Sequence, residues 1–243
     1  MIILHDERVI FLKTRKVAGT SFEIALSRFA GSSDVITPIE KDDEAIRRSK
    51  GYRGPQNYRK PLWSLFLQPT RRDFRGLSRG KLPARFFPHI SAKEVRYLVG
   101  PRIWNSYTKL SIIRDPWDYA VSSYFWAKRH GDCGEFDTWC RSNEHLLTAN
   151  KRQYFIDNEY VIDIMVRYEH FDEDMRALER EKPNLSGLFE DFSTIQAKGG
   201  WRPRTGATAR DLFGSAPQAA ELIRDRCAFE ISTFGYQSPL QSV

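Results

Sequence analysis

Two segments of this chain repeat the same order: a short apolar strand, a polar loop and an amphipathic helix. The first begins with the apolar run Val9–Leu12, and behind its loop apolar residues recur at helical spacing, at Phe22, Ala25, Leu26 and Phe29. The second begins with Leu110–Ile113, after which Asp115 is a suitable N-cap and Pro116 a suitable first helical residue. Strands that alternate with helices predict an α/β fold in which helices flank a parallel sheet.

Weaker signals continue the alternation. Further strands are expected at Val35–Thr37, which stops before Pro38, and at Val161–Val166. Further helices are expected from the capping box of Ser91 and Glu94 to Gly100, near Phe171–Leu178, and on the face formed by Ile223, Cys227, Ile231 and Phe234. With 243 residues the chain is long enough for one sizeable core, so we expect a single domain over residues 1–243.

The stretch from Lys41 to Pro88 breaks this pattern. Gly, Pro and Arg interrupt it, and no helical or strand period can be followed. Residues 41–85 hold 13 Lys and Arg against 4 Asp and Glu, a net charge of +9, whereas the whole chain carries +7. We therefore expect a basic, loop-rich insertion at about residues 41–88 that meets an anionic partner: a nucleotide, an acidic glycan, a lipid headgroup or a nucleic acid.

Composition argues against several classes of protein. No run of about 18 uncharged apolar residues is present, and the apolar start at Met1–Leu4 leads at once into charged residues, so neither a membrane span nor a secretory leader is expected. The three cysteines, Cys133, Cys140 and Cys227, are odd in number and lie outside any CxxC pattern, which argues against a disulfide framework or a zinc site. These features favour a cytoplasmic protein.

The loop of the first segment carries residue types that bind anions. It reads Lys13-Thr-Arg-Lys16-Val-Ala-Gly19-Thr20-Ser21. A glycine lets the backbone approach an anion, the free amides of the first helical turn point at it, and Lys16 adds an ammonium group. The P-loop pattern, in which a lysine follows the last glycine, is absent, and this disfavours an ordinary Mg²⁺-nucleotide site. The alternative is a plain helix cap beside a solvated lysine.

The second loop offers another anion-binding group. Arg114 stands at its mouth, and Ser122 follows about two turns into the helix. An arginine there can hold a phosphate through a forked pair of hydrogen bonds, and the serine hydroxyl can add a donor. Two such loops suit one ligand with two separated anionic groups.

Both loops resemble the nucleotide motifs of a known enzyme family. Lys16-Val-Ala-Gly-Thr-Ser21 resembles the 5′-phosphosulfate loop of sulfotransferases that use 3′-phosphoadenosine 5′-phosphosulfate (PAPS), and the stretch from Arg114 through Ser122 to Tyr124 resembles their 3′-phosphate motif. Bacterial members related to carbohydrate sulfotransferases are similar at Asp34-Val-Ile-Thr-Pro38, Gly54-Pro-Gln-Asn-Tyr58, Tyr168-Glu169 and Phe234-Gly-Tyr236. The resemblance covers nearly the whole chain and implies a P-loop-like three-layer fold with a central parallel sheet, whose ligand lies at the carboxyl ends of the strands.

The resemblance also implies a role for each matching residue. Lys16 would stabilise the leaving phosphate oxygen, Gly19, Thr20 and Ser21 would cradle the 5′-phosphosulfate, and Arg114 and Ser122 would hold the 3′-phosphate. A late basic loop would close over the nucleotide. The implied cofactor-binding residues are Arg15, Lys16, Ala18, Gly19, Thr20, Ser21, Arg114, Ser122, Lys198 and Arg202. The chain departs from the family pattern at Arg15, where proline is usual, and at Tyr119, where a second arginine is frequent.

His89 is the candidate base. Transfer of a sulfuryl group to a hydroxyl needs a group that takes the hydroxyl proton, and histidine suits neutral pH. His89 lies just before the helix start at Ser91, and the resembling enzymes place a catalytic histidine or glutamate in this stretch. The alternative is that His89 only packs against the helix or caps it. No metal is required, because Lys16 and helix amides can neutralise the leaving group.

The sequence therefore predicts a PAPS-dependent sulfotransferase that acts on the hydroxyl of a saccharide or a small metabolite and releases adenosine 3′,5′-bisphosphate. The basic segment mildly favours an acidic saccharide as acceptor, and nucleic acid is a less favoured partner. Two alternatives stay open: a nucleotide-dependent kinase of similar fold, and a noncatalytic polyanion-binding protein that uses residues 41–85.

Overall fold

One mixed β-sheet forms the centre of the protein. The structure, a computed structural model, describes residues 1–61, 71–78, 80, 82–131, 133–195 and 208–240. In these ranges five strands pair in the order β3-β1-β2-β4-β7, and their bounds are Val35–Ile36, Ile2–Leu4, Val9–Leu12, Thr108–Ile113 and Ile164–Arg167. Strands β2, β4 and β7 run parallel, whereas β1 is antiparallel to both of its neighbours.

The expected parallel sheet is thus wrong at one edge. No strand is predicted at Met1–Leu4, yet β1 occupies the place between β2 and β3. Residues 5–8 alone connect β1 to β2, and this connection is too short for the crossover that parallel strands require. The two strands therefore form an antiparallel pair, with Ile3 opposite Ile10.

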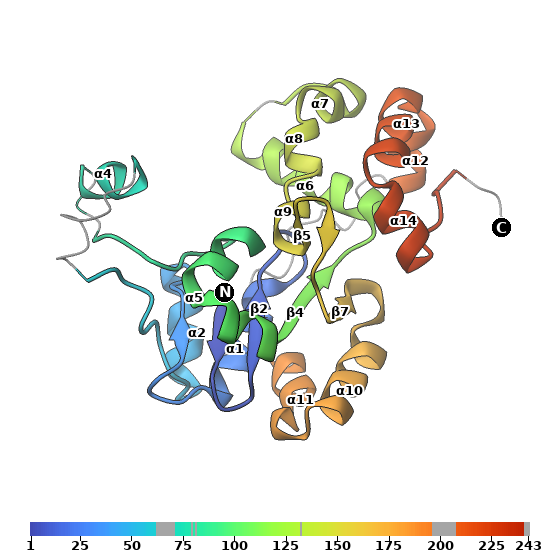
Figure 1. Cartoon of the computed structure of the whole chain (residues 1–243). Helices are drawn as coiled ribbons and strands as arrows, with labels where there is room; N and C mark the ends of the chain where they lie inside the picture. The colour runs from blue at the N-terminus through green and yellow to red at the C-terminus, as the bar shows by residue number, and fades with distance from the viewer. Residues whose placement is uncertain (62–70, 79, 81, 132, 196–207, 241–243) are drawn as a thin grey trace.

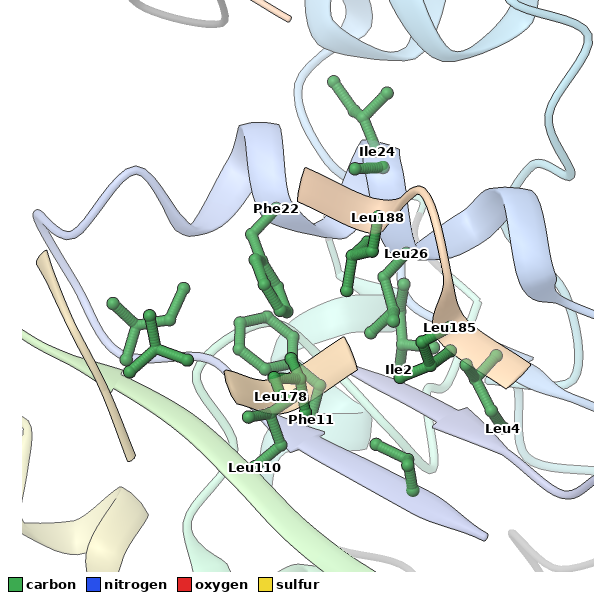
Figure 2. Packing of buried hydrophobic residues seen from close by; sticks show 14 of the residues in the cluster. Ile2, Leu4, Phe11, Phe22, Ile24, Leu26, Leu110, Leu178, Leu185 and Leu188 are labelled. Carbon is green, nitrogen blue, oxygen red and sulfur yellow. The ribbon is translucent and has the colours of Figure 1, made fainter. Parts of the chain in front are cut away.

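Both faces of the sheet are buried. Side chains alternate along each strand, so Ile2, Leu4 and Phe11 enter one core while Ile3 and Ile10 enter another. Figure 2 shows Phe11 against Phe22 and Leu26 of the first helix, with leucines of the chain's later helices over them. A strand that is buried on both faces needs a continuous apolar run, which explains why short runs such as Val9–Leu12 could be recognised.

Helices cover the two faces (Figure 1). On one face lie α1 (Gly19–Leu26), α10 (Phe171–Glu181) and α11 (Leu188–Ser193). The other face carries α5 (Ala92–Ser106), α9 (Lys151–Tyr154) and a small hairpin of β5 (Phe155–Ile156) and β6 (Glu159–Tyr160). The sheet is therefore the middle of three layers. Short 3-10 helices span Ser27–Phe29, Tyr168–His170 and Pro183–Leu185.

A separate helical cluster packs beyond the end of β4. Its members are α6 (Pro116–His130), α7 (Phe136–Ser142), α8 (Glu144–Leu147), α12 (Ala209–Gly214) and α13 (Pro217–Arg226), followed by α14 (Ala228–Phe234). Phe213 links α12 to α6 and α7. Its ring packs edge to face on the rings of Trp117 and Phe136, with ring centres 5.2 Å and 5.0 Å apart. The single terminal helix expected from the spacing is two helices, α13 and α14, which are separated at Cys227.

The stretch of residues 41–88 is less irregular than expected. Its first nine residues form α2 (Lys41–Ser49), and Arg71–Leu77 form α4, which stands away from the sheet in Figure 1. Acidic residues fill the first turn of α2 and two arginines fill its last, an order that favours a helix through its dipole although few apolar residues mark the period. The description of this insertion as loop-rich is therefore wrong for its beginning.

The element α5 has the predicted start and the predicted break. It begins at the capping box of Ser91 and Glu94, and its backbone leaves the helical region at Gly100, where φ is 78° and ψ is 168°. Helical backbone resumes at Pro101 and continues to Ser106, so the element consists of two helical parts joined at a sharp kink. No helix among the described residues is long and apolar enough to cross a membrane.

Candidate anion-binding site at the ends of β2 and β4

The two predicted loops leave neighbouring strands at the same edge of the sheet. Strands β2 and β4 are a parallel pair in which Leu12 lies opposite Ser111, so residues 13–18 and 114–115 emerge side by side. The Ser111 hydroxyl donates to the Leu12 carbonyl at 2.7 Å, and the Thr14 hydroxyl donates to the carbonyl of Ile112. These bonds fix the start of the first loop against the end of β4.

The first loop turns into α1 through an unusual backbone. Lys16 and Ala18 have φ angles of 59° and 55°, in the left-handed region that non-glycine residues seldom adopt. Ala18 is the N-cap of α1, and no side chain within the described residues caps this helix. The amides of its first turn, which includes Gly19 and Thr20, are thus oriented toward the loop, as in helix ends that bind anions.

Lys13 connects the start of this loop to α1. Its ammonium pairs with the carboxylate of Glu23 on α1 and donates to the Thr20 hydroxyl at 3.2 Å. The Lys13 and Glu23 side chains are 7% and 0% exposed. A Cβ added at Gly19 would lie 3.2 Å from Cγ of Lys13, so a larger residue there requires the paired Lys13 side chain to shift. Ser21, another predicted ligand, is buried in the same turn.

Arg114 joins the second loop to the first. Its Nη1 donates to the carbonyl of Lys16 at 3.0 Å, and its Nη2 pairs with Asp118 at 2.8 Å. The guanidinium also lies 4.6 Å from the ring centre of Tyr168, just after β7. Its Nε is buried and forms no hydrogen bond with any described residue. The predicted phosphate ligand is therefore at the site, and two of its donors are already engaged by the protein.

Asp115 and Glu169 hold the second loop at its base. Asp115 caps α6 by accepting from the amide of Trp117 at 2.8 Å, as the sequence predicted. Its own amide donates to Glu169 at 2.9 Å, and the hydroxyl of Tyr236 donates to the same carboxylate at 3.2 Å. Burial, with a smaller contribution from the charge of Glu169, raises the pKa of Asp115 to about 6.

One face of α6 is directed to the first loop. Asp118, Ser122 and Trp126 are four residues apart and therefore share this face. Arg114 pairs with Asp118 near the start of the helix, and the Lys16 ammonium lies 4.5 Å from the ring centre of Trp126 two turns later. Ser122, half-buried, stands between these two contacts.

His89 packs against the first loop, from a segment more than 70 residues away in sequence. Its Nδ1 lies 3.1 Å from the carbonyl oxygen of Lys13. A carbonyl can only accept, so Nδ1 carries the proton and the neutral ring has its lone pair on Nε2. Burial, together with the charges of Lys13 and Arg15, lowers the pKa of His89 to about 3. The neutral tautomer is therefore the one present near neutral pH.

The segment around α9 holds both His89 and the first loop. Asn150 accepts from the amide of Arg15 at 2.8 Å and donates to its carbonyl at 3.2 Å. Arg152 and Gln153 each donate to the carbonyl of His89 at 2.9 Å. Sequence reasoning missed all three, because a polar run such as Asn150–Gln153 is typical of a surface. It also missed Lys13, Glu23 and Glu169 as contacts of the site.

Two predicted ligands, Lys198 and Arg202, lie outside the described residues. Two surface pockets have volumes of about 360 Å³, beside Glu169 and α10, and about 600 Å³, along residues 55–61. Neither is lined by Lys16, His89 or Arg114. In the described part of the chain no cluster of three His, Cys, Asp or Glu residues is arranged to ligate a metal ion.

Comparisons with the models of protein families, with curated protein sequences and with solved structures find no match to this chain.

Proposed function

We propose that this chain is a sulfotransferase that moves a sulfuryl group from PAPS to an acceptor hydroxyl, and that its fold is of the P-loop-like type. One observation carries the proposal: the two predicted anion loops leave neighbouring parallel strands and are joined by the hydrogen bond from Arg114 to the Lys16 carbonyl. A ligand with a 5′-phosphosulfate and a 3′-phosphate presents two anionic groups to two such loops. The packing of His89 on the first loop adds a candidate base at the same place.

The residues present fit the donor. The uncapped first turn of α1, with Gly19, Thr20 and Ser21, would hold the 5′-phosphosulfate, with Arg15, Lys16 and Ala18 in the loop before it. Arg114 and Ser122 would hold the 3′-phosphate, the guanidinium through the Nη hydrogens that its contacts with Lys16 and Asp118 do not use. Lys198 and Arg202 stay predictions, as nothing is described of them. The donor supplies an activated sulfur with a good leaving group.

The transfer assigns distinct tasks to Lys16 and His89. A bond forms between the acceptor oxygen and sulfur while the bond from sulfur to the 5′-phosphate oxygen breaks, and adenosine 3′,5′-bisphosphate leaves. His89 takes the acceptor proton on Nε2, the nitrogen that its bond to the Lys13 carbonyl leaves available. The Lys16 ammonium neutralises the charge that develops on the leaving oxygen.

A base with a pKa of about 3 is weak, and the charges of Lys13 and Arg15 are part of the cause. A multiply charged anion bound at the first loop offsets those charges. Donor binding is therefore expected to raise the pKa of His89 and make it a better proton acceptor when the hydroxyl is in place. The basicity of His89 is in this way coupled to occupancy of the loop.

Thermal stability with and without nucleotides tests the donor class. Adenosine 3′,5′-bisphosphate is expected to raise the melting temperature without metal, because a ligand that binds only the folded chain stabilises it by mass action. ADP should protect less. Stronger protection by ADP with Mg²⁺ would favour the kinase alternative and count against a sulfotransferase.

The acceptor is proposed only by class: a hydroxyl-bearing molecule, with an acidic saccharide favoured by the net charge of residues 41–85, in a cytoplasmic setting. A screen of PAPS against pools of saccharides and small metabolites, read by the mass gain of one sulfuryl group in the product, identifies it.

A further inference from the structure

Trp126 is an exposed aromatic side chain at the edge of the candidate site. It lies on α6 and is 46% exposed, whereas Trp117 and Tyr124 of the same helix are buried in the helical cluster. The Lys16 ammonium is positioned over its ring, 4.5 Å from the centre. A cation at this distance is attracted by the negative face of an indole.

The backbone and the side chain of Lys16 are held at different points of α6. The Lys16 carbonyl accepts from Arg114 at the start of the helix, and the ammonium reaches Trp126 near its end. Ser122 lies on the same helical face, one turn before Trp126. The lysine assigned to the leaving oxygen is therefore bound to an indole face, beside the proposed phosphate-binding serine.

A second contact fixes the orientation of the indole. The His130 ring lies 4.4 Å from the Trp126 ring, tilted by 39°. Its Nδ1 donates to the Trp126 carbonyl at 2.7 Å. The ring that receives Lys16 is thus supported by its own helix before any ligand arrives.

We propose that Trp126 is a positioning residue, which holds the Lys16 ammonium in the ligand-free protein and gives it up when the anionic donor binds. This inference rests on the proposed function of Lys16. An exposed cation–π contact is weaker than a charge-assisted hydrogen bond to a phosphate, so the donor displaces the indole. Trp126 then competes with the donor for Lys16 and fixes the position of the ammonium until the donor binds.

Binding of adenosine 3′,5′-bisphosphate to a set of variants tests the competition. Trp126→Leu is expected to tighten binding about two- to five-fold, the range that corresponds to an exposed cation–π contact, and Trp126→Phe to tighten it less. In a Lys16→Met background both substitutions should change nothing. Tyr97→Leu, at the most exposed aromatic residue of α5, is the matched control and should bind like the wild type.

The outcomes separate this inference from the proposed function. Equal binding by the wild type and both Trp126 variants, or the same change with and without Lys16, overturns the positioning role while leaving the sulfotransferase proposal intact. If the wild type binds no bisphosphate, the proposed function itself fails. A double-mutant cycle on unfolding without ligand checks the contact independently: coupling of about two- to five-fold between Lys16 and Trp126 supports it, and no coupling overturns it.

Discussion

The two loops at the sheet edge are built in different ways. The loop after β2 uses left-handed residues, has no side-chain cap on α1 in the described chain, and is held by distant side chains such as Asn150. The loop after β4 contains Asp115, which caps α6 ahead of Pro116, and carries its positive charge on one side chain, Arg114. The first loop therefore presents backbone amides to an anion, whereas the second presents a guanidinium.

The two loops also differ in their anchors. A buried ion pair of Lys13 and Glu23 fixes the first loop, and a partly exposed pair of Arg114 and Asp118 occupies the second. Removal of one partner of a buried ion pair is strongly destabilising, whereas an exposed pair contributes little to stability. We infer that the first loop is a rigid cradle and that the second can exchange the carboxylate for a phosphate.

The largest effect is expected at His89, whose ring contacts the first loop at the Lys13 carbonyl. His89→Ala should lower the rate of sulfuryl transfer by about 10² to 10⁴, the range for loss of a general base, and leave bisphosphate affinity nearly unchanged. His145→Ala, at an exposed histidine of α8, is the control. A folded His89→Ala enzyme with near-normal transfer would exclude His89 as the base.

The same residue gives a pH test. The pKa of His89 is about 3 without ligand, so activity is lost only when the pH falls through that value in the free enzyme. Because a bound donor raises this pKa, the acid limb of kcat should lie at higher pH than the acid limb of kcat/KM. Coincident limbs would show that His89 and the loop are not coupled.

Loss of the Lys13 anchor should destabilise the protein much more than loss of an exposed ion pair. Lys13→Met removes one of the two ammonium groups that pair with the buried Glu23 carboxylate, the other being the N-terminus of Met1. The free energy of unfolding, measured in urea, should fall by about 3 kcal/mol, the lower end of the range for a broken buried pair, because the Met1 ammonium remains. Lys93→Met, which breaks an exposed pair with Asp157, should leave the free energy of unfolding nearly unchanged. Equal losses in the two variants would contradict the description of the first loop as rigid.

A smaller effect is expected from Gly19→Ala. The added Cβ meets the Lys13 side chain at 3.2 Å, and Lys13 cannot move away without leaving Glu23. We expect a loss of about 1 to 3 kcal/mol of stability, as in other overpacked sites. Gly54→Ala, where nothing lies within 4 Å, should be nearly neutral. Comparable unfolding curves for the two variants would mean that the loop adapts.

The smallest effect is expected at Asp118, where the direction of the change in bisphosphate affinity is the test. Asp118→Asn removes a negative charge beside the proposed 3′-phosphate and releases Arg114, so bisphosphate binding should tighten by up to about five-fold. Asp172→Asn breaks an exposed pair with Arg176 of the same spacing on α10 and should leave binding unchanged. Weaker binding in Asp118→Asn would instead make Asp118 a support for Arg114.

Local signals identified the parts of the fold that are set by nearby residues. The N-cap of Asp115 and the capping box of Ser91 depend on residues within one turn, and both were predicted. The place of β1 between β2 and β3 depends on pairing across the chain, so the mixed sheet could not be read from a strand-to-helix alternation. Helix α2 did carry a signal, acidic residues before basic ones, which apolar periodicity overlooks.

The candidate site shows the same division. Residues of the two loops could be named because each loop is continuous in sequence. The supports Asn150 and Gln153 could not, because they reach the site from a separate segment. The burial of Lys13 depends likewise on Glu23, which looks like an ordinary surface glutamate of a helix in the sequence.

The central claim is that the two loops share one ligand. Calorimetry tests it by measuring the affinities of adenosine 3′,5′-bisphosphate and 5′-AMP for the wild type and for Arg114→Ala. We expect the wild type to prefer the bisphosphate, and Arg114→Ala to lose about ten- to hundred-fold of that preference, since a charge-assisted hydrogen bond is removed, while binding AMP as before. An Arg114→Ala protein that discriminates between the two nucleotides as well as the wild type would contradict a 3′-phosphate site at the second loop.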